Sequence, residues 1–119
     1  MADTSNAPLA ARFGADMRRG VAQLSDLGYD ATYFRRMLGD HGPVEAARRL
    51  ALDPVPSYGL WRLKELGRLD MSVEMWVLLP WYEPLFPPDV REQAENKLAA
   101  LGIDVATELA GLVRRQTPP

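Results

Sequence analysis

The sequence predicts an all-α fold, a single compact orthogonal bundle of six to eight helices, several of them short. Three observations support this. Apolar residues recur every three or four positions along most of the chain, which is the spacing of one face of a helix. Glycine, proline and helix-capping residues separate these segments. No segment alternates polar and apolar residues as a half-buried strand does.

Size and composition indicate one domain. The chain has 119 residues, 47% of them hydrophobic and 25% charged, which suits a soluble globular protein with one core. We expect a single helical domain over residues 1–119, with loose ends at about 1–6 and 116–119. The longest apolar run, Met75–Leu79, is far shorter than a membrane span, and no secretory signal is visible, so we expect a cytoplasmic protein. The preference for arginine over lysine, with many Ala, Gly and Pro, is typical of a bacterial gene of high GC content.

The first helix is expected to be long. Its apolar stripe consists of Leu9, Phe13, Met17, Val21, Leu24 and Leu27. Ser5 or Asn6 is placed to cap its start, and Gly28 to end it. Gly14 and Gly20 each weaken this helix by about 1 kcal/mol relative to alanine, or else let another helix approach closely.

Two shorter helices follow, separated by a predicted turn over residues 39–42. Asp30 is expected to cap the first of them. Its apolar side is formed by Tyr33, Phe34, Met37 and Leu38. Pro43 opens the second helix. Its stripe is formed by Val44, Ala47, Leu50 and Ala51. Residues 53–56, with the sequence Asp-Pro-Val-Pro, then force an extended link.

Ser57 and Ser72 are each placed to cap a further helix. The helix after Ser57 ends at Gly67. Its inward side chains are expected to be Leu60, Trp61, Leu63 and Leu66. The helix after Ser72 is expected over Val73–Leu79, and residues 81–87, which contain two prolines, predict an ordered aromatic loop.

Two helices complete the chain. Pro88 opens the first and Gly102 stops it. The apolar stripe of this helix is Val90, Ala94, Leu98 and Leu101. Asp104 is placed to cap the last helix. Its inward residues are Val105, Leu109, Leu112 and Val113.

The segment from His41 to Phe86 resembles a known family. Its parts are HGPVEAARRL, SYGLWRLKELGRLDMSVEMWVL and EPLF. They resemble small, mostly uncharacterised bacterial helical domains with a G-L-x-x-L-x-E-L-G-R-L-D-x-S-V-E core and a Leu-Phe before a final pair of helices. The resemblance covers about half the chain and implies a helical fold. It implies no activity or substrate, so no functional residue is carried over.

Several kinds of chemistry lack the residues they require. The chain has no cysteine and a single histidine, His41, which excludes disulfides, thiol nucleophiles and metal sites made of several imidazoles. It also lacks a phosphate-binding loop and a dinucleotide fingerprint. Asp40 precedes His41, but sequence neighbours do not generally form a catalytic dyad. We therefore expect no catalytic residue, no cofactor and no metal.

The leading functional prediction is a non-catalytic module that binds another protein or a second copy of itself. Its basis is a concentration of aromatic residues after Ser72, which is either core or a partly exposed patch. Just before it, Arg68 either pairs with Asp70 or Glu74 to brace a corner or joins a recognition surface. The candidate partner-binding residues are Trp76, Trp81, Tyr82, Arg68 and Glu74.

Two alternatives stay open. Residues 42–67 resemble a helix-turn-helix that could bind DNA, although the proline link is longer than the usual turn. The candidate nucleic-acid contacts are Arg48, Arg49, Arg62, Lys64 and Arg68. Against this, the net charge is −2, and residues 69–101 carry six acidic and two basic side chains. The second alternative is an enzyme or a small-ligand binder whose pocket leaves no linear motif. An enclosed pocket with convergent polar groups would favour that alternative, and a flat aromatic patch would favour a protein partner.

Overall fold

The computed structural model describes residues 6–119, and this part of the chain is helical with no strand. The α-helices are α1 (Ala7–Asp26), α2 (Thr32–His41), α3 (Pro43–Leu52), α4 (Tyr58–Glu65), α5 (Val73–Val77), α6 (Pro88–Ala100) and α7 (Val105–Arg115). Two 3₁₀ helices, η2 (Leu69–Met71) and η3 (Pro80–Leu85), flank α5. The prediction of an all-α bundle is confirmed for these residues. None of the described helices is both long and apolar enough to cross a membrane.

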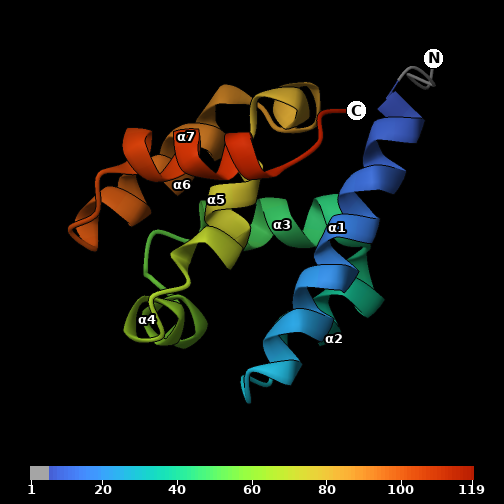
Figure 1. Ribbon diagram of the computed structural model, residues 1–119. Helices are drawn as coiled ribbons and strands as arrows, with labels where there is room; N and C mark the ends of the chain where they lie inside the picture. Colours follow the sequence, from blue (N-terminus) through green and yellow to red (C-terminus); the bar gives the residue numbers. More distant parts are fainter. Residues whose placement is uncertain (1–5) are drawn as a thin grey trace.

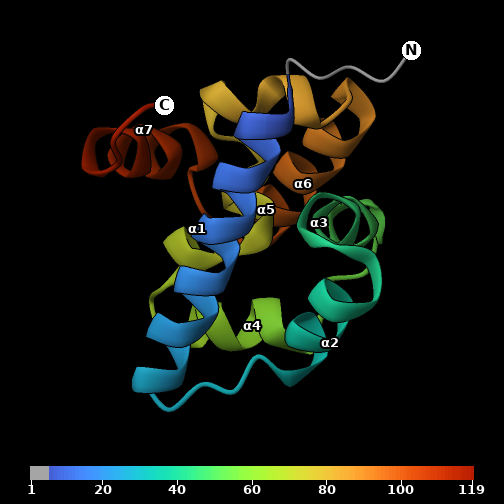
Figure 2. The same ribbon diagram turned by 90° about the vertical axis from the view of Figure 1, so that its right-hand side faces the viewer.

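The short helix α5 lies at the centre of the molecule (Figures 1 and 2). It packs against α3 and α6 and against both 3₁₀ helices. Met75 and Val77 on α5 are fully buried. The buried side chains of the other elements join them in one continuous cluster. The core is therefore organised around a helix of five residues, and α2 and α4 lie below it in the view of Figure 2.

The strongest aromatic contacts of this core join α1 to the segment after α5. The Phe13 ring lies edge-on to the ring of Tyr82 at 5.0 Å and to that of Phe86 at 5.1 Å between centroids. All three side chains are buried. Edge-to-face pairs of this kind add to the free energy gained from burying apolar area.

Three predicted helix caps are present. Ser57 and Ser72 each accept a hydrogen bond from the backbone N–H three residues later, at 3.1 Å in both cases. Asp104 accepts one from the N–H of Thr107 at 3.2 Å. Each bond satisfies one of the N–H groups that a helix start leaves free.

The predicted turn over residues 39–42 is wrong, because α2 continues to His41. Gly39 is tolerated inside the helix, and the chain reverses only at Gly42, whose φ of +79° is a conformation that suits glycine. The predicted cap by Asp30 is also wrong. Ala31 occupies the N-cap position with no side-chain hydrogen bond, and Asp30 lies 3.7 Å from Arg35 instead.

The loop predicted for residues 81–87 is wrong as well. Residues Pro80–Leu85 form η3, and the predicted helix before it stops at Val77. A proline at the first helical position is compatible with this, since its missing N–H would have no partner there.

Three side chains predicted to face the core are exposed. Leu27 is 51% exposed because it lies at the C-cap of α1, beyond the part of the helix that other elements cover. Tyr33 on α2 is 66% exposed and Trp61 on α4 is 45% exposed. Both helices lie at the edge of the bundle, so only one side of each is covered (Figure 2).

The two glycines of α1 differ in their surroundings. A Cβ atom on Gly14 would lie 3.0 Å from Cγ of Pro43, so this glycine does allow a close approach, to the first residue of α3. A Cβ atom on Gly20 would meet nothing within 4 Å. Asn6 occupies the N-cap of α1 without a capping hydrogen bond, and its side chain donates instead to the carbonyl oxygen of Pro84 at 3.4 Å. The alternative cap, Ser5, lies outside the described residues.

The structure describes the C-terminal end that was predicted to be loose, but not most of the N-terminal one. Residues 1–5 lie outside the part that the structure describes. At the other end, the side chain of Arg12 donates a hydrogen bond to the carbonyl oxygen of Thr117. The last residues therefore run beside α1.

Candidate functional site

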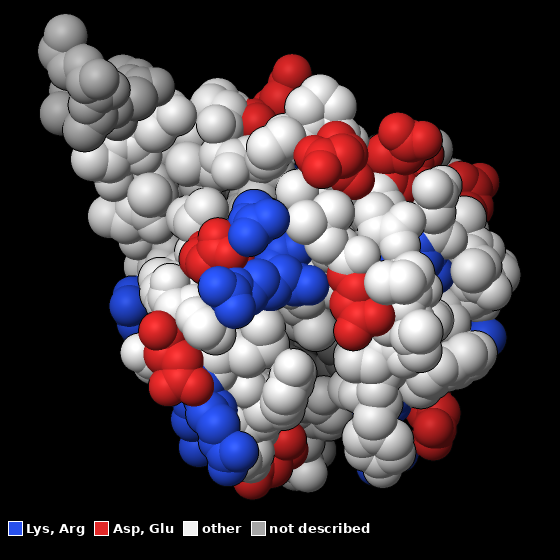
Figure 3. Space-filling model, turned by 180° about the vertical axis from the view of Figure 1, so that it is seen from behind, with Lys and Arg blue, Asp and Glu red and all other residues white. Residues whose placement is uncertain are grey.

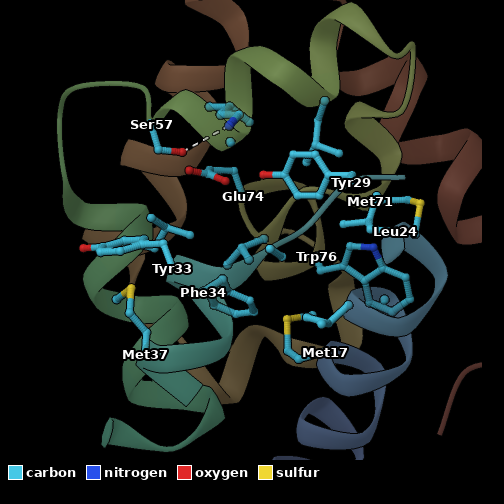
Figure 4. Close-up of a pocket in the computed structure, with 18 of the residues that line it drawn as sticks. Met17, Leu24, Tyr29, Tyr33, Phe34, Met37, Ser57, Met71, Glu74 and Trp76 are labelled. Carbon is cyan, nitrogen blue, oxygen red and sulfur yellow. Dashed lines mark hydrogen bonds between the residues drawn. The ribbon is translucent and has the colours of Figure 1, made fainter. Parts of the chain in front are cut away.

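A partly open cavity of about 920 Å³ lies between α1, α2, α4 and the η2–α5 segment (Figure 4). This volume is within the range of about 300–1,000 Å³ that is typical of small-molecule sites. Its walls are rich in methionine and aromatic side chains, among them Met17, Leu24, Phe34, Met37, Met71 and Trp76. Methionine side chains adapt to irregular shapes, so such walls suit a mostly apolar molecule.

Charged side chains also line this cavity, among them Arg19, Arg36, Asp40, Arg49, Arg68 and Arg115. Three further polar side chains converge in it from different elements (Figure 4). Glu74 comes from the first turn of α5, Ser57 from the cap of α4, and Tyr29 from the connection between α1 and α2. The Tyr29 hydroxyl points toward the part of the cavity where Glu74 lies. Burial raises the pKa of Tyr29, and the nearby Tyr58 and Glu74 raise it further. The Tyr29 hydroxyl is therefore protonated at neutral pH and can donate a hydrogen bond.

Glu74 forms a buried ion pair with Lys97 of α6. The Nζ atom of Lys97 lies 2.8 Å from Oε2 of Glu74, and each side chain is only 2% exposed. Lys97 also donates a hydrogen bond of 2.9 Å to the carbonyl oxygen of Leu50. The pair makes the carboxylate tolerable inside the protein, because an isolated buried charge is very costly. It also leaves the local net charge near zero.

Trp76 forms part of the cavity wall, and its side chain is held in place by η2 and by Arg68, the residue before η2. The indole N–H of Trp76 donates to the backbone carbonyl of Asp70 at 2.9 Å. The carboxylate of Asp70 accepts a hydrogen bond of 3.1 Å from Arg68 and lies 3.8 Å from Arg115 of α7. Arg68 thus braces this corner through Asp70, one of the two interpretations open at the sequence level. Glu74 pairs with Lys97 and not with Arg68.

The predicted partner-binding residues do not form a flat exposed patch. Tyr82 is fully buried, and its hydroxyl donates a hydrogen bond to the carboxylate of Asp16. Glu74 is buried, and Trp76 and Trp81 are half-buried. The aromatic concentration after Ser72 therefore contributes mainly to the core and to the wall of the cavity. The large exposed apolar side chains of the described part lie elsewhere and are Leu27, Tyr33, Val55, Tyr58 and Trp61.

The helices of the proposed helix-turn-helix have different packing partners. The main contacts of α3 are with α1, α2, α5 and α6, whereas those of α4 are with η2. A helix-turn-helix requires its two helices to pack on one another. The extended proline link carries α4 away from α3, so the arrangement does not favour DNA binding.

The basic residues of that segment have local partners. Arg48 and Arg49 donate hydrogen bonds of 2.8 and 2.9 Å to Glu45, and these bonds lower the pKa of Glu45 to about 2. Arg62 donates to Glu65 at 3.3 Å. Viewed from behind, the surface shows basic side chains with acidic ones beside them, not a continuous basic stripe (Figure 3).

The Tyr29 hydroxyl fits against α4 at Gly59. A Cβ atom on this glycine would lie 2.4 Å from the Tyr29 oxygen but 3.7 Å from Cζ of the same ring. Only the hydroxyl therefore conflicts with a larger residue at position 59. We expect Gly59→Ala to stabilise the protein by up to about 1 kcal/mol in a Tyr29→Phe background, because alanine favours the helix. In the wild-type background the gain should vanish or become a loss.

A double-mutant cycle in urea measures this coupling between residues 29 and 59. Equal effects of Gly59→Ala in the two backgrounds would show that the Tyr29 hydroxyl does not lie at this position.

Three of the predicted partner-binding candidates, Arg68, Glu74 and Trp76, line this cavity, but most of its other residues were not predicted as site residues. Met17, Leu24 and Phe34 were expected on apolar faces, Ser57 was expected as a cap, and Tyr29 had no expected role. One signal was available, since Glu74 lies between Val73 and Met75 in an otherwise apolar helix. A carboxylate flanked in this way on a short helix is a candidate for burial with a charged partner.

Comparisons with family models, with curated proteins and with solved structures find no match for this chain. The resemblance to a bacterial domain family, the bacterial origin and the cytoplasmic location therefore stay predictions. The function of the protein has therefore to be inferred from the geometry of the cavity.

Proposed function

We propose that this protein binds a small, mostly apolar molecule in the cavity between α1, α2, α4 and α5. One observation carries the proposal: a cavity of about 920 Å³ with methionine and aromatic walls encloses convergent polar groups. This combination is the usual composition of a ligand site, in which apolar walls supply affinity and a few polar groups fix orientation. It corresponds to the ligand-binding alternative of the sequence analysis.

Binding fits the polar groups better than catalysis does. The Glu74 carboxylate is neutralised by Lys97 at 2.8 Å, and the Ser57 oxygen already accepts the hydrogen bond that caps α4. A general base or a nucleophile needs to be free to exchange its proton with the substrate. His41 lies exposed at the end of α2, on the rim of the cavity.

The leading sequence prediction, recognition of another protein, has weaker support. Tyr82 and Glu74 are buried, so neither can contribute to a contact surface without a rearrangement of the core. The arrangement of Tyr33 and Tyr58 adds to the case for a ligand, because both exposed aromatic side chains line the cavity.

Filling the cavity tests the proposal. Gly20 lines it, and a side chain there meets no atom within 4 Å of its Cβ, so Gly20→Leu extends into the cavity without straining α1. We expect wild-type protein to bind butylpyrene, an uncharged fluorescent hydrocarbon, with energy transfer from tryptophan to pyrene. Gly20→Leu should weaken that binding at least about tenfold, because the new side chain overlaps the ligand.

Gly39→Leu is the matched control. Gly39 is also a helical glycine with open space at its Cβ, but it does not line the cavity. Both substitutions replace glycine with a better helix former, so a difference between them reports the cavity alone. Equal binding of butylpyrene by the two variants would contradict the proposed function, as would a wild type that binds neither butylpyrene nor a pyrene derivative with a polar head group.

A further inference from the structure

We propose that the ligand carries an uncharged alcohol group that hydrogen-bonds to Glu74, attached to an apolar body that lies against the methionine and aromatic walls. This inference rests on the proposed function and names its ligand class. It follows from what the buried polar groups of the cavity can accept and donate, taken one group at a time.

The Glu74 carboxylate requires a hydrogen-bond donor on the ligand. The side chain lines the cavity, and among residues 6–119 the polar partner of its carboxylate is Lys97, which lies beside Oε2. An ionised carboxylate accepts several hydrogen bonds and donates none. Oε2 is buried and has no hydrogen-bond partner among the described residues, and a purely hydrocarbon ligand would offer it none. The group of the ligand that lies beside Glu74 should therefore donate a hydrogen bond.

The donor should carry no charge. An ammonium group beside the carboxylate would also lie close to the Lys97 ammonium, which is 2.8 Å from the same carboxylate. Its attraction to Glu74 would be offset by that repulsion in a buried site. A carboxylate group on the ligand would face Glu74 with the same sign of charge. The pair of opposite charges thus selects against both kinds of ion at the position beside Glu74.

Tyr29 supplies the reason for an alcohol. Its protonated hydroxyl points toward the part of the cavity where Glu74 lies (Figure 4). The oxygen of an alcohol can accept a hydrogen bond from Tyr29 while its own hydrogen is donated to Glu74. One hydroxyl group therefore satisfies both side chains.

Four probes with the same pyrene body and butyl chain test the inference: pyrenebutanol, pyrenebutylamine, pyrenebutyric acid and butylpyrene. At neutral pH they differ in presenting an alcohol, a cation, an anion or no head group. We expect pyrenebutanol to bind tightest, about tenfold or more above each of the others, since only the alcohol donates a hydrogen bond to Glu74 without placing a further charge beside the Glu74–Lys97 pair.

The variant Tyr29→Phe locates the head group. It removes one hydroxyl and should lower the affinity for pyrenebutanol about three- to tenfold, with no change for butylpyrene. Thr32→Val is the control, because it removes one hydroxyl from an exposed residue of α2 that does not line the cavity. It should change neither affinity.

The outcomes separate the two proposals. If butylpyrene binds but the four probes are equal, or a charged probe binds tightest, the inference about the alcohol is overturned and the proposed function stands. An equal change in the affinity for pyrenebutanol in Tyr29→Phe and Thr32→Val would also overturn it. If none of the probes binds, the proposed function fails.

Discussion

Replacing Lys97 alone with methionine is expected to destabilise the protein by about 3–5 kcal/mol, because Glu74 would remain buried without its counter-charge. Methionine has a similar length and keeps the packing of α6, so the loss reports mainly the charge. The hydrogen bond from Lys97 to the Leu50 carbonyl disappears as well. Urea unfolding followed by far-ultraviolet circular dichroism measures the change in the free energy of unfolding.

Two further variants show whether the unpaired charge of Glu74 causes the loss of stability in Lys97→Met. Replacing both partners, as Glu74→Leu with Lys97→Met, should recover most of the lost stability, since an apolar pair requires no compensation. Lys64→Met is the control, because Lys64 is exposed on α4, with its ammonium 5.4 Å from the centre of the Trp61 ring. Its effect should stay within about 0.5 kcal/mol. A loss below about 1 kcal/mol for Lys97→Met would show that Glu74 and Lys97 are not paired in the interior.

Truncating Phe13 to alanine is expected to cost about 3–5 kcal/mol, the usual range for a phenylalanine in a packed core. The side chain is fully buried, and it joins α1 to Tyr82 and Phe86 at centroid distances of 5.0 and 5.1 Å. The change removes two edge-to-face contacts and leaves a void between α1 and η3. Thermal and urea unfolding should both show the loss.

Leu27→Ala provides the comparison for Phe13→Ala on the same predicted apolar stripe. Leu27 is 51% exposed, so its truncation should change stability by no more than about 0.5 kcal/mol. If the two substitutions cost the same, the stripe predicted from the sequence would be a better guide to the core than the described structure. Phe13 does not line the cavity, so butylpyrene should bind the folded fraction of Phe13→Ala as it binds the wild type.

The features that the sequence predicted well are local. The caps by Ser57, Ser72 and Asp104 each involve a side chain and a backbone N–H three residues later, so both partners are visible in a short stretch of sequence. The predicted ends at Gly28, Gly67 and Gly102 are local for the same reason. The error at residues 39–42 arose where two local signals competed, a glycine against the continuation of a helix. The error at Asp30 is a shift of one residue, because α2 has its N-cap at Ala31.

The features that the sequence left open depend on distant parts of the chain. An apolar stripe predicts that a helix has a buried side, but which residues it buries depends on the helices that cover it. Leu63 and Trp61 illustrate this, because both were predicted to face inward on α4 and only Leu63 is buried. The ion pair between Glu74 and Lys97 joins α5 to α6, and nothing near Glu74 in the sequence identifies its partner.

The sequence by itself therefore determined that the chain is helical, where most helices begin and end, and which chemistries lack the residues they need. The tertiary structure alone decided that the aromatic residues after Ser72 form core and cavity wall, that Glu74 is buried beside Lys97, and that α1, α2, α4 and α5 enclose a cavity. The physical reason is the distance along the chain over which each kind of interaction acts. Capping and helix propensity act within about four residues, whereas burial, ion pairing in the interior and the shape of a cavity arise only when segments far apart in the sequence pack together.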